Sequence, residues 1–145
     1  MDSSDKPVTE ADFHLARSRM LDAFSRLERE ISELLLRNTK CLSDGASLGQ
    51  KAEALRKVPA SPTYSKARRD KVQKLLDDLE PLLKYRADIV HSIMRTFEID
   101  SHLVGCFINS RVDYSLPMPA LIVDLSQMNR ISGGVAALAR EFSKP

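Results

Sequence analysis

Hydrophobic residues recur at helical spacing over the first quarter of the chain. From Val8 to about Asn38, apolar side chains return every seven residues, and a second row interleaves with the first. Charged residues fill most of the other positions. This pattern predicts one long amphipathic helix that packs along a single seam. The seam is formed by Phe13, Met20, Phe24, Leu27, Ile31 and Leu34.

Two more helical segments follow. The run Ser47-Leu48-Gly49-Gln50 matches a capping box and predicts a short helix that ends near Lys57, before a linker that contains Pro59 and Pro62. A second long helix is expected from about Tyr64 to about Arg95, and Pro81 inside it predicts a kink or a break. Its stripe comprises Val72, Leu75, Leu79, Leu82, Arg86, Ile89 or Val90, and Ile93.

The pattern changes after Phe97. Residues 102–108 and 120–123 are short and β-prone, and the residues between them are rich in turn formers, which favours a small hairpin or a paired extended arm. From Leu125 onward, apolar residues again repeat at helical spacing, with Asp124 or Ser126 available as the cap. Gly133-Gly134 either weakens this last helix or allows a neighbouring backbone to approach.

Together these elements predict an all-α fold, a four-helix bundle with a short extended or hairpin insert before the last helix. Residues 1–7 read as a flexible tail, and residues 8–145 as a single helical domain. A chain of 145 residues is long enough for one hydrophobic core.

Composition narrows the function classes only slightly. The chain is 43% hydrophobic and 29% charged, and its net charge of +2 is too small to indicate polyanion binding by itself. Free thiols are the simplest state for Cys41 and Cys106, and a single disulfide between them is the alternative. The histidines lack zinc-site spacing, so no metal or cofactor is expected. A polar amino terminus and the lack of long apolar runs predict a cytoplasmic protein that does not enter membranes.

The candidate chemistry lies near the end of the second long helix, where four residues separate Arg86 from His91. An arginine that stabilises negative charge and a histidine that titrates near neutral pH can together cleave a phosphodiester without a metal. Asp88 either orients His91 or pairs with Lys84. The structural alternative has Arg86 reaching along the helix seam to a carboxylate, and His91 capping or packing near the helix end.

The order of these segments resembles the HEPN superfamily of small α-helical proteins. The resemblance rests on the long first helix, on SLGQKAEAL (residues 47–55), on LLDDLEPLLKYRADIVH (75–91) and on the last helix, LSQMNRISGGVAALAREF (125–142). The family motif is an arginine, four to six residues and a histidine. Arg86 and His91 match it, while Ala87 stands where a polar residue commonly follows the arginine. Arg95 and His102 form a second match that spans an expected helix end.

The resemblance implies a metal-independent endoribonuclease of a toxin–antitoxin or phage-defence system, with its site at a homodimer interface. It also implies an antitoxin partner, which could be a small nucleotidyltransferase. In that function His91 and Arg86 are catalytic and Asp88 assists. The alternative is a non-catalytic helical bundle that binds a partner protein or a nucleotide.

A basic run opens the second long helix. Lys66, Arg68, Arg69 and Lys71 lie within six residues and could hold an RNA backbone. The alternative is an ordinary solvated helix face, which is the more common role of such runs.

Overall fold

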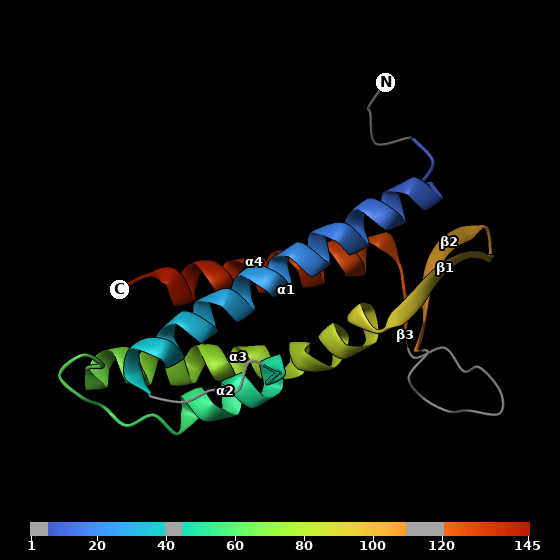
Figure 1. Ribbon diagram of the computed structural model, residues 1–145. Coiled ribbons are helices and arrows are strands. Elements are labelled where there is room, and N and C mark those ends of the chain that lie inside the picture. The colour runs from blue at the N-terminus through green and yellow to red at the C-terminus, as the bar shows by residue number, and fades with distance from the viewer. Residues whose placement is uncertain (1–5, 40–44, 110–120) are drawn as a thin grey trace.

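The computed structural model describes residues 6–39, 45–109 and 121–145. This part of the chain forms four helices and three strands, and Figure 1 shows α1 and α4 side by side, α2 and α3 beyond them, and the strands at one end. In chain order the elements are α1 (Glu10–Asn38), α2 (Leu48–Arg56), α3 (Lys66–Val90), β1 (Ser92–Ile99), β2 (His102–Asn109), β3 (Leu121–Val123) and α4 (Leu125–Ser143).

The first helix matches its prediction closely. Thr9 caps α1 through a capping box with Asp12, so two amide groups at the helix start are satisfied locally. Every residue of the predicted seam is buried. Heptad spacing was therefore a sufficient guide to the face that α1 turns to the core.

The start of each other helix also follows local sequence signals. Ser47 and Gln50 form the predicted capping box of α2, and Asp124 forms another with Gln127 at the start of α4. Helix α3 continues through Pro81 without a break. In α4, none of the described residues lies within 4 Å of where a Cβ would stand on Gly133 or Gly134, so their backbone does not approach closely there.

The all-α fold class is wrong, because a three-stranded antiparallel sheet packs at one end of the helices. Its order is β1-β2-β3, with Met94 opposite Phe107 and Gly105 opposite Val123. Helix α3 ends at Val90, so Ile93 and Arg95 belong to β1 and not to the helix. Ile93 fits the helical stripe of α3, and it also fits the alternation of exposed and buried residues that a strand shows. Pairing with β2 stabilises the strand at this position.

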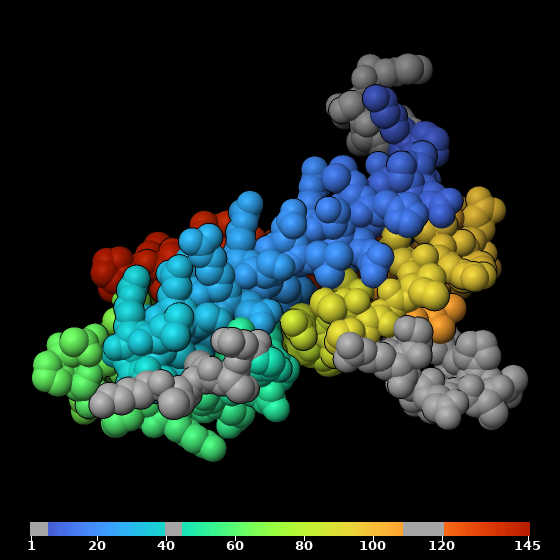
Figure 2. All heavy atoms as spheres, viewed as in Figure 1, coloured from blue at the N-terminus to red at the C-terminus, as the bar shows by residue number. Residues whose placement is uncertain are grey.

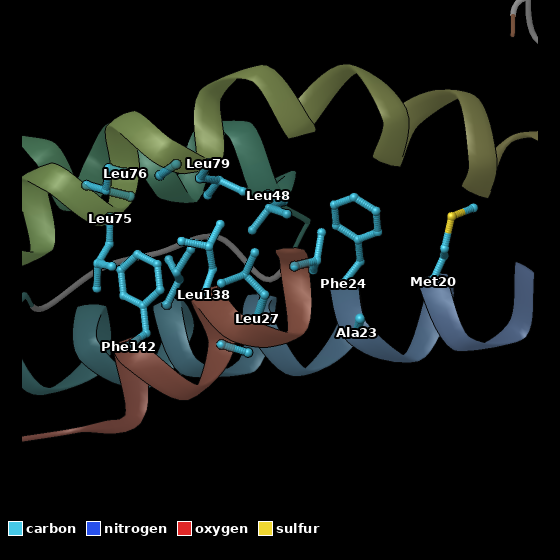
Figure 3. Close-up of a cluster of buried hydrophobic side chains, with 14 of the residues drawn as sticks. Met20, Ala23, Phe24, Leu27, Leu48, Leu75, Leu76, Leu79, Leu138 and Phe142 are labelled. Carbon is cyan, nitrogen blue, oxygen red and sulfur yellow. The ribbon is translucent and has the colours of Figure 1, made fainter. Parts of the chain in front are cut away.

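One hydrophobic core joins all four helices and the inner face of the sheet. Figure 3 shows side chains of α1 and α4 meeting those of α2 and α3, with Leu27, Leu79 and Phe142 at the centre of the contact. At the sheet end, a Cβ on Gly105 would stand 2.9 Å from Cδ1 of Phe13. Strand β2 therefore packs against α1 at a distance that only glycine allows.

Some predictions fall largely outside the described residues. They concern most of the 1–7 tail, the turn-rich segment before residue 120 and the state of Cys41. Cys106 lies within the described part and is a buried free thiol. Among the helices described, none is long and apolar enough to cross a membrane.

Candidate functional site

The predicted catalytic residues gather where α3 gives way to β1. His91 is the C-cap of α3, with backbone angles of φ −102° and ψ 5°, and its N–H donates to the Ala87 carbonyl at 3.2 Å. Arg86 and Asp88 lie on the last turns of the helix. All three side chains are half-buried, so the junction is a partly desolvated group of polar residues at the boundary of two elements.

Arg86 takes part in an ion cluster that links three helices. Its Nη2 lies 3.4 Å from Glu28 Oε2 on α1, and the other oxygen of that carboxylate is 3.0 Å from Lys51 Nζ on α2. The three side chains are 15–26% exposed, so solvent screens these contacts only partly. This geometry is the one that the structural alternative predicted for Arg86.

Asp88 makes no ion pair or side-chain hydrogen bond among the described residues. Burial raises the pKa of its carboxyl above the ordinary value, and the nearby charge of Lys84 partly opposes that rise. Lys84 itself lies over the ring of Tyr85, with 5.0 Å between its Nζ and the ring centroid. Neither predicted role of Asp88, the orientation of His91 or a pair with Lys84, is seen as a direct contact.

Arg17 belongs to this junction, and the sequence analysis missed it. Its Nη2 donates to the carbonyl oxygens of Ile89 at 3.1 Å and Ser92 at 3.0 Å, which flank His91 in the chain. A cation at the carboxyl end of a helix also interacts favourably with the helix dipole. A sequence signal existed, because Arg17 follows the buried Phe13 by four residues and so lies on the apolar stripe of α1.

The junction still holds hydrogen-bonding atoms without partners. Arg17 Nε and the hydroxyl of Ser92 are buried and have no hydrogen-bond partner among the described residues. Buried polar groups in native proteins nearly always have a partner, which can be a water molecule or a ligand. The junction thus combines a histidine with two arginines, one of which has an unused donor.

The predicted RNA-binding run does not form one continuous surface. Arg69 donates to the carbonyls of Val58 and Arg56, at 2.9 and 3.3 Å, and thereby ties α3 to the α2–α3 linker. Arg68 donates to the Lys144 carbonyl, and Lys71 lies 3.7 Å from Glu141. Among the four predicted residues, only Lys66 has no such contact within the described part of the chain.

Two grooves lie elsewhere on the surface. One, of about 510 Å³, runs between α1 and α4 and has mixed charge, with arginines 26, 29 and 140 beside glutamates 30 and 33. The other, of about 490 Å³, lies between α3, β3 and α4 and includes Tyr85 and Lys84. Neither groove is lined by Arg86 or His91, so the junction is not part of either groove.

No group of three or more potential metal ligands occurs among the residues that the structure describes. A comparison of the chain with family models, with curated proteins and with solved structures finds no match.

Proposed function

We propose that this protein is a HEPN-like, metal-independent endoribonuclease that acts in the cytoplasm as one half of a toxin–antitoxin or phage-defence pair. The observation that supports the proposal best is the α3–β1 junction, where His91 ends a helix beside Arg17 and five residues after Arg86. Histidine and arginine are the residues that RNA cleavage without a metal requires.

The chemistry needs no cofactor, because RNA carries its own nucleophile. His91 takes the proton from a ribose 2′-hydroxyl, and the oxygen attacks the adjacent phosphorus. The bond from phosphorus to the 5′-oxygen breaks, a 2′,3′-cyclic phosphate forms, and the leaving oxygen takes up a proton. An arginine beside the phosphate stabilises the negative charge that builds on its oxygens.

Arg86 is the arginine assigned to the phosphate. Its contact with Glu28 is a single one of 3.4 Å, longer than a strong charge-assisted hydrogen bond, and the side chain is 24% exposed. A phosphate can therefore compete for the guanidinium while Lys51 continues to hold Glu28. Lys66 and Lys71 are the residues of the basic run best placed to attract RNA, because their ammonium groups are not bound to backbone carbonyls.

The test is cleavage of labelled RNA by the purified protein in EDTA. The wild type should cut, and His91→Ala should lower the rate by at least one hundredfold, the lower range for the loss of a general acid–base group. His102→Ala is the matched control, since His102 is an exposed histidine of the second motif match and should cut normally. A substrate with 2′-deoxyribose at the cleaved position should resist the wild type.

Two results would contradict the proposal. Folded wild-type protein that leaves RNA intact in EDTA would exclude this activity on the RNAs tested. Equal cleavage by wild type and His91→Ala would indicate a contaminating nuclease.

The Glu28–Arg86 contact also favours a second candidate, a non-catalytic bundle that binds a partner protein or a nucleotide. In that function Arg86 stabilises the fold and Ala87 reflects the absence of catalysis. Glu28→Gln separates the two candidates, because it removes the negative charge that holds Arg86 and leaves only a neutral acceptor. Cleavage should persist or rise if Arg86 acts on phosphate, and only stability should fall if its role is structural.

A further inference from the structure

Strand β1 has an open edge. It lies at one side of the sheet, and β2 is the only strand that pairs with it among the described residues. The Ser92 carbonyl accepts a hydrogen bond from Arg17, and beyond it the register with β2 continues to Ile99 without a bulge, so the outward N–H and C=O groups of residues 93–99 form a regular row. Such a row is a template for another strand. In Figure 2 the surface over β1, coloured yellow, faces the viewer.

The outer face of the sheet is apolar as well as exposed. Ile93, Phe97 and Ile99 on β1 are 58%, 50% and 50% exposed. The opposite face carries Met94 and Phe107, which are buried against the helices. Large apolar side chains gathered on one exposed face typically mark an interaction surface.

We propose that a second copy of this chain pairs with β1 along this edge, antiparallel, around a two-fold axis at Thr96. A symmetric pair of this kind places residues of equal distance from the axis opposite each other. Because opposite residues must share a face of the sheet, the axis has to pass through a residue and not between two residues. Only a few registers are therefore possible for a strand of eight residues.

The charges and the length of β1 select among these registers. An axis at Arg95 or at Glu98 sets two like charges directly opposite, which is destabilising. An axis at Phe97 pairs only residues 95–99, and an axis at Met94 only residues 92–96, which is five residues in each case. An axis at Thr96 pairs residues 93–99, which is seven residues and nearly the whole strand.

The same register makes the edge complementary to itself. Arg95 of each copy stands opposite Phe97 of the other, the arrangement of a cation beside an aromatic ring, and it occurs twice. Ile93 stands opposite Ile99, and Thr96 opposite Thr96, both favourable pairs in antiparallel sheets. The interface is smaller than the roughly 800 Å² per partner of a standard complex, so we expect a weak dimer that depends on concentration.

This interface is separate from the site proposed for RNA cleavage. His91 lies five residues before Thr96, so at about 3.4 Å per residue the two copies of His91 are about 34 Å apart. The pairing does not form a shared catalytic site and does not depend on one. The edge dimer therefore differs from the homodimer that the resemblance implies, so a failed cross-link at Thr96→Cys would rule out this pairing and leave the proposed function to its own test in EDTA.

Disulfide trapping tests the register directly. In a full chain with Cys41→Ser and Cys106→Ala, Thr96→Cys should form a covalent dimer under mild oxidation, because residue 96 stands opposite itself. Glu98→Cys, on the same face of the strand, stands opposite Met94 and should not cross-link. Equal cross-linking at both positions, or none at Thr96→Cys in a folded protein at millimolar concentration, would overturn the proposal.

Sedimentation equilibrium tests the edge without new cysteines. Phe97→Lys places a cation opposite Arg95 and should raise the dimer dissociation constant at least tenfold. Ile122→Lys is the matched control, since Ile122 is 51% exposed on the same face but lies on β3, away from the β1 edge. If both variants weaken the dimer equally, the copies stack face to face and the edge pairing is wrong. A wild type that stays monomeric at millimolar concentration also overturns it.

Discussion

At the scale of single residues, the side chains that matter most here are cations with distant partners. Arg17 bonds to carbonyls 72 and 75 positions away in the chain, and Arg86 meets a carboxylate 58 positions away. Each has the residue type that a nuclease needs and also holds the fold together. Their structural and chemical roles must therefore be separated by experiment.

Replacement of Arg17 by methionine should lower the free energy of unfolding by about 2–3 kcal/mol. The variant removes two partly buried hydrogen bonds from a charged group to the carbonyls of Ile89 and Ser92. Arg19→Met is the control, because Arg19 is exposed on the same helix and should change stability by less than about 0.5 kcal/mol. Urea unfolding curves measure both values, and equal effects would contradict the role given to Arg17.

At the scale of elements, the close contact between α1 and β2 determines where the sheet sits. Gly105 lies against the ring of Phe13, which is fully buried. The sheet therefore depends on a glycine in the middle of a strand, where this residue normally weakens pairing.

Gly105→Ala should lower the free energy of unfolding by about 1–3 kcal/mol, the usual cost of overpacking a core. The added methyl group would stand 2.9 Å from Phe13 Cδ1, so the ring or the strand must shift. Phe13→Leu combined with Gly105→Ala should recover part of the lost stability, because the smaller side chain leaves room for the methyl group. Gly133→Ala is the control and should be neutral or stabilising, because Gly133 is an exposed position within α4. A double-mutant cycle by thermal unfolding measures the coupling, and additive effects would contradict the contact.

At the scale of the whole molecule, the end of α4 is tied to the start of α3 by charge. Glu141 lies 2.6 Å from Lys144 and 3.7 Å from Lys71, while Arg68 donates to the Lys144 carbonyl. The hydrogen bond and the charge of Lys144 hold the pKa of Glu141 below its ordinary 4.5, with a smaller contribution from Lys71. Exposed ion pairs contribute little to stability, so we expect these contacts to add a small contribution that acid removes.

Glu141→Gln should flatten the dependence of stability on pH below about 5. The pKa is lower in the folded state than in the unfolded state, so the carboxylate adds stability above the unfolded value and loses it as pH falls through the folded value. Lys144→Met should flatten the curve in the same way, and Glu98→Gln, an exposed carboxylate without an ion pair in the described part, is the control. Identical curves for wild type and Glu141→Gln would contradict the linkage.

The sequence was a good guide wherever the signal was local. Capping boxes at Ser47 and Asp124 and the seam of α1 were confirmed, because each depends on residues within one or two helical turns. Strand β1 was the main error. Its first residues, which include Ile93, continue the helical spacing of α3, and only the pairing with β2 shows that they leave the helix.

The candidate site also combines features that the local sequence indicated with contacts between distant segments. The sequence by itself indicated the residues that we propose for the chemistry, Arg86, Asp88 and His91, and it placed them near the end of a helix. Only the tertiary structure decided that Arg86 meets Glu28, that Arg17 joins the junction and that β1 leaves an open edge. The physical reason is range: helix caps and periodicity act over a few residues, whereas ion pairs and strand pairing join segments that are far apart in the chain.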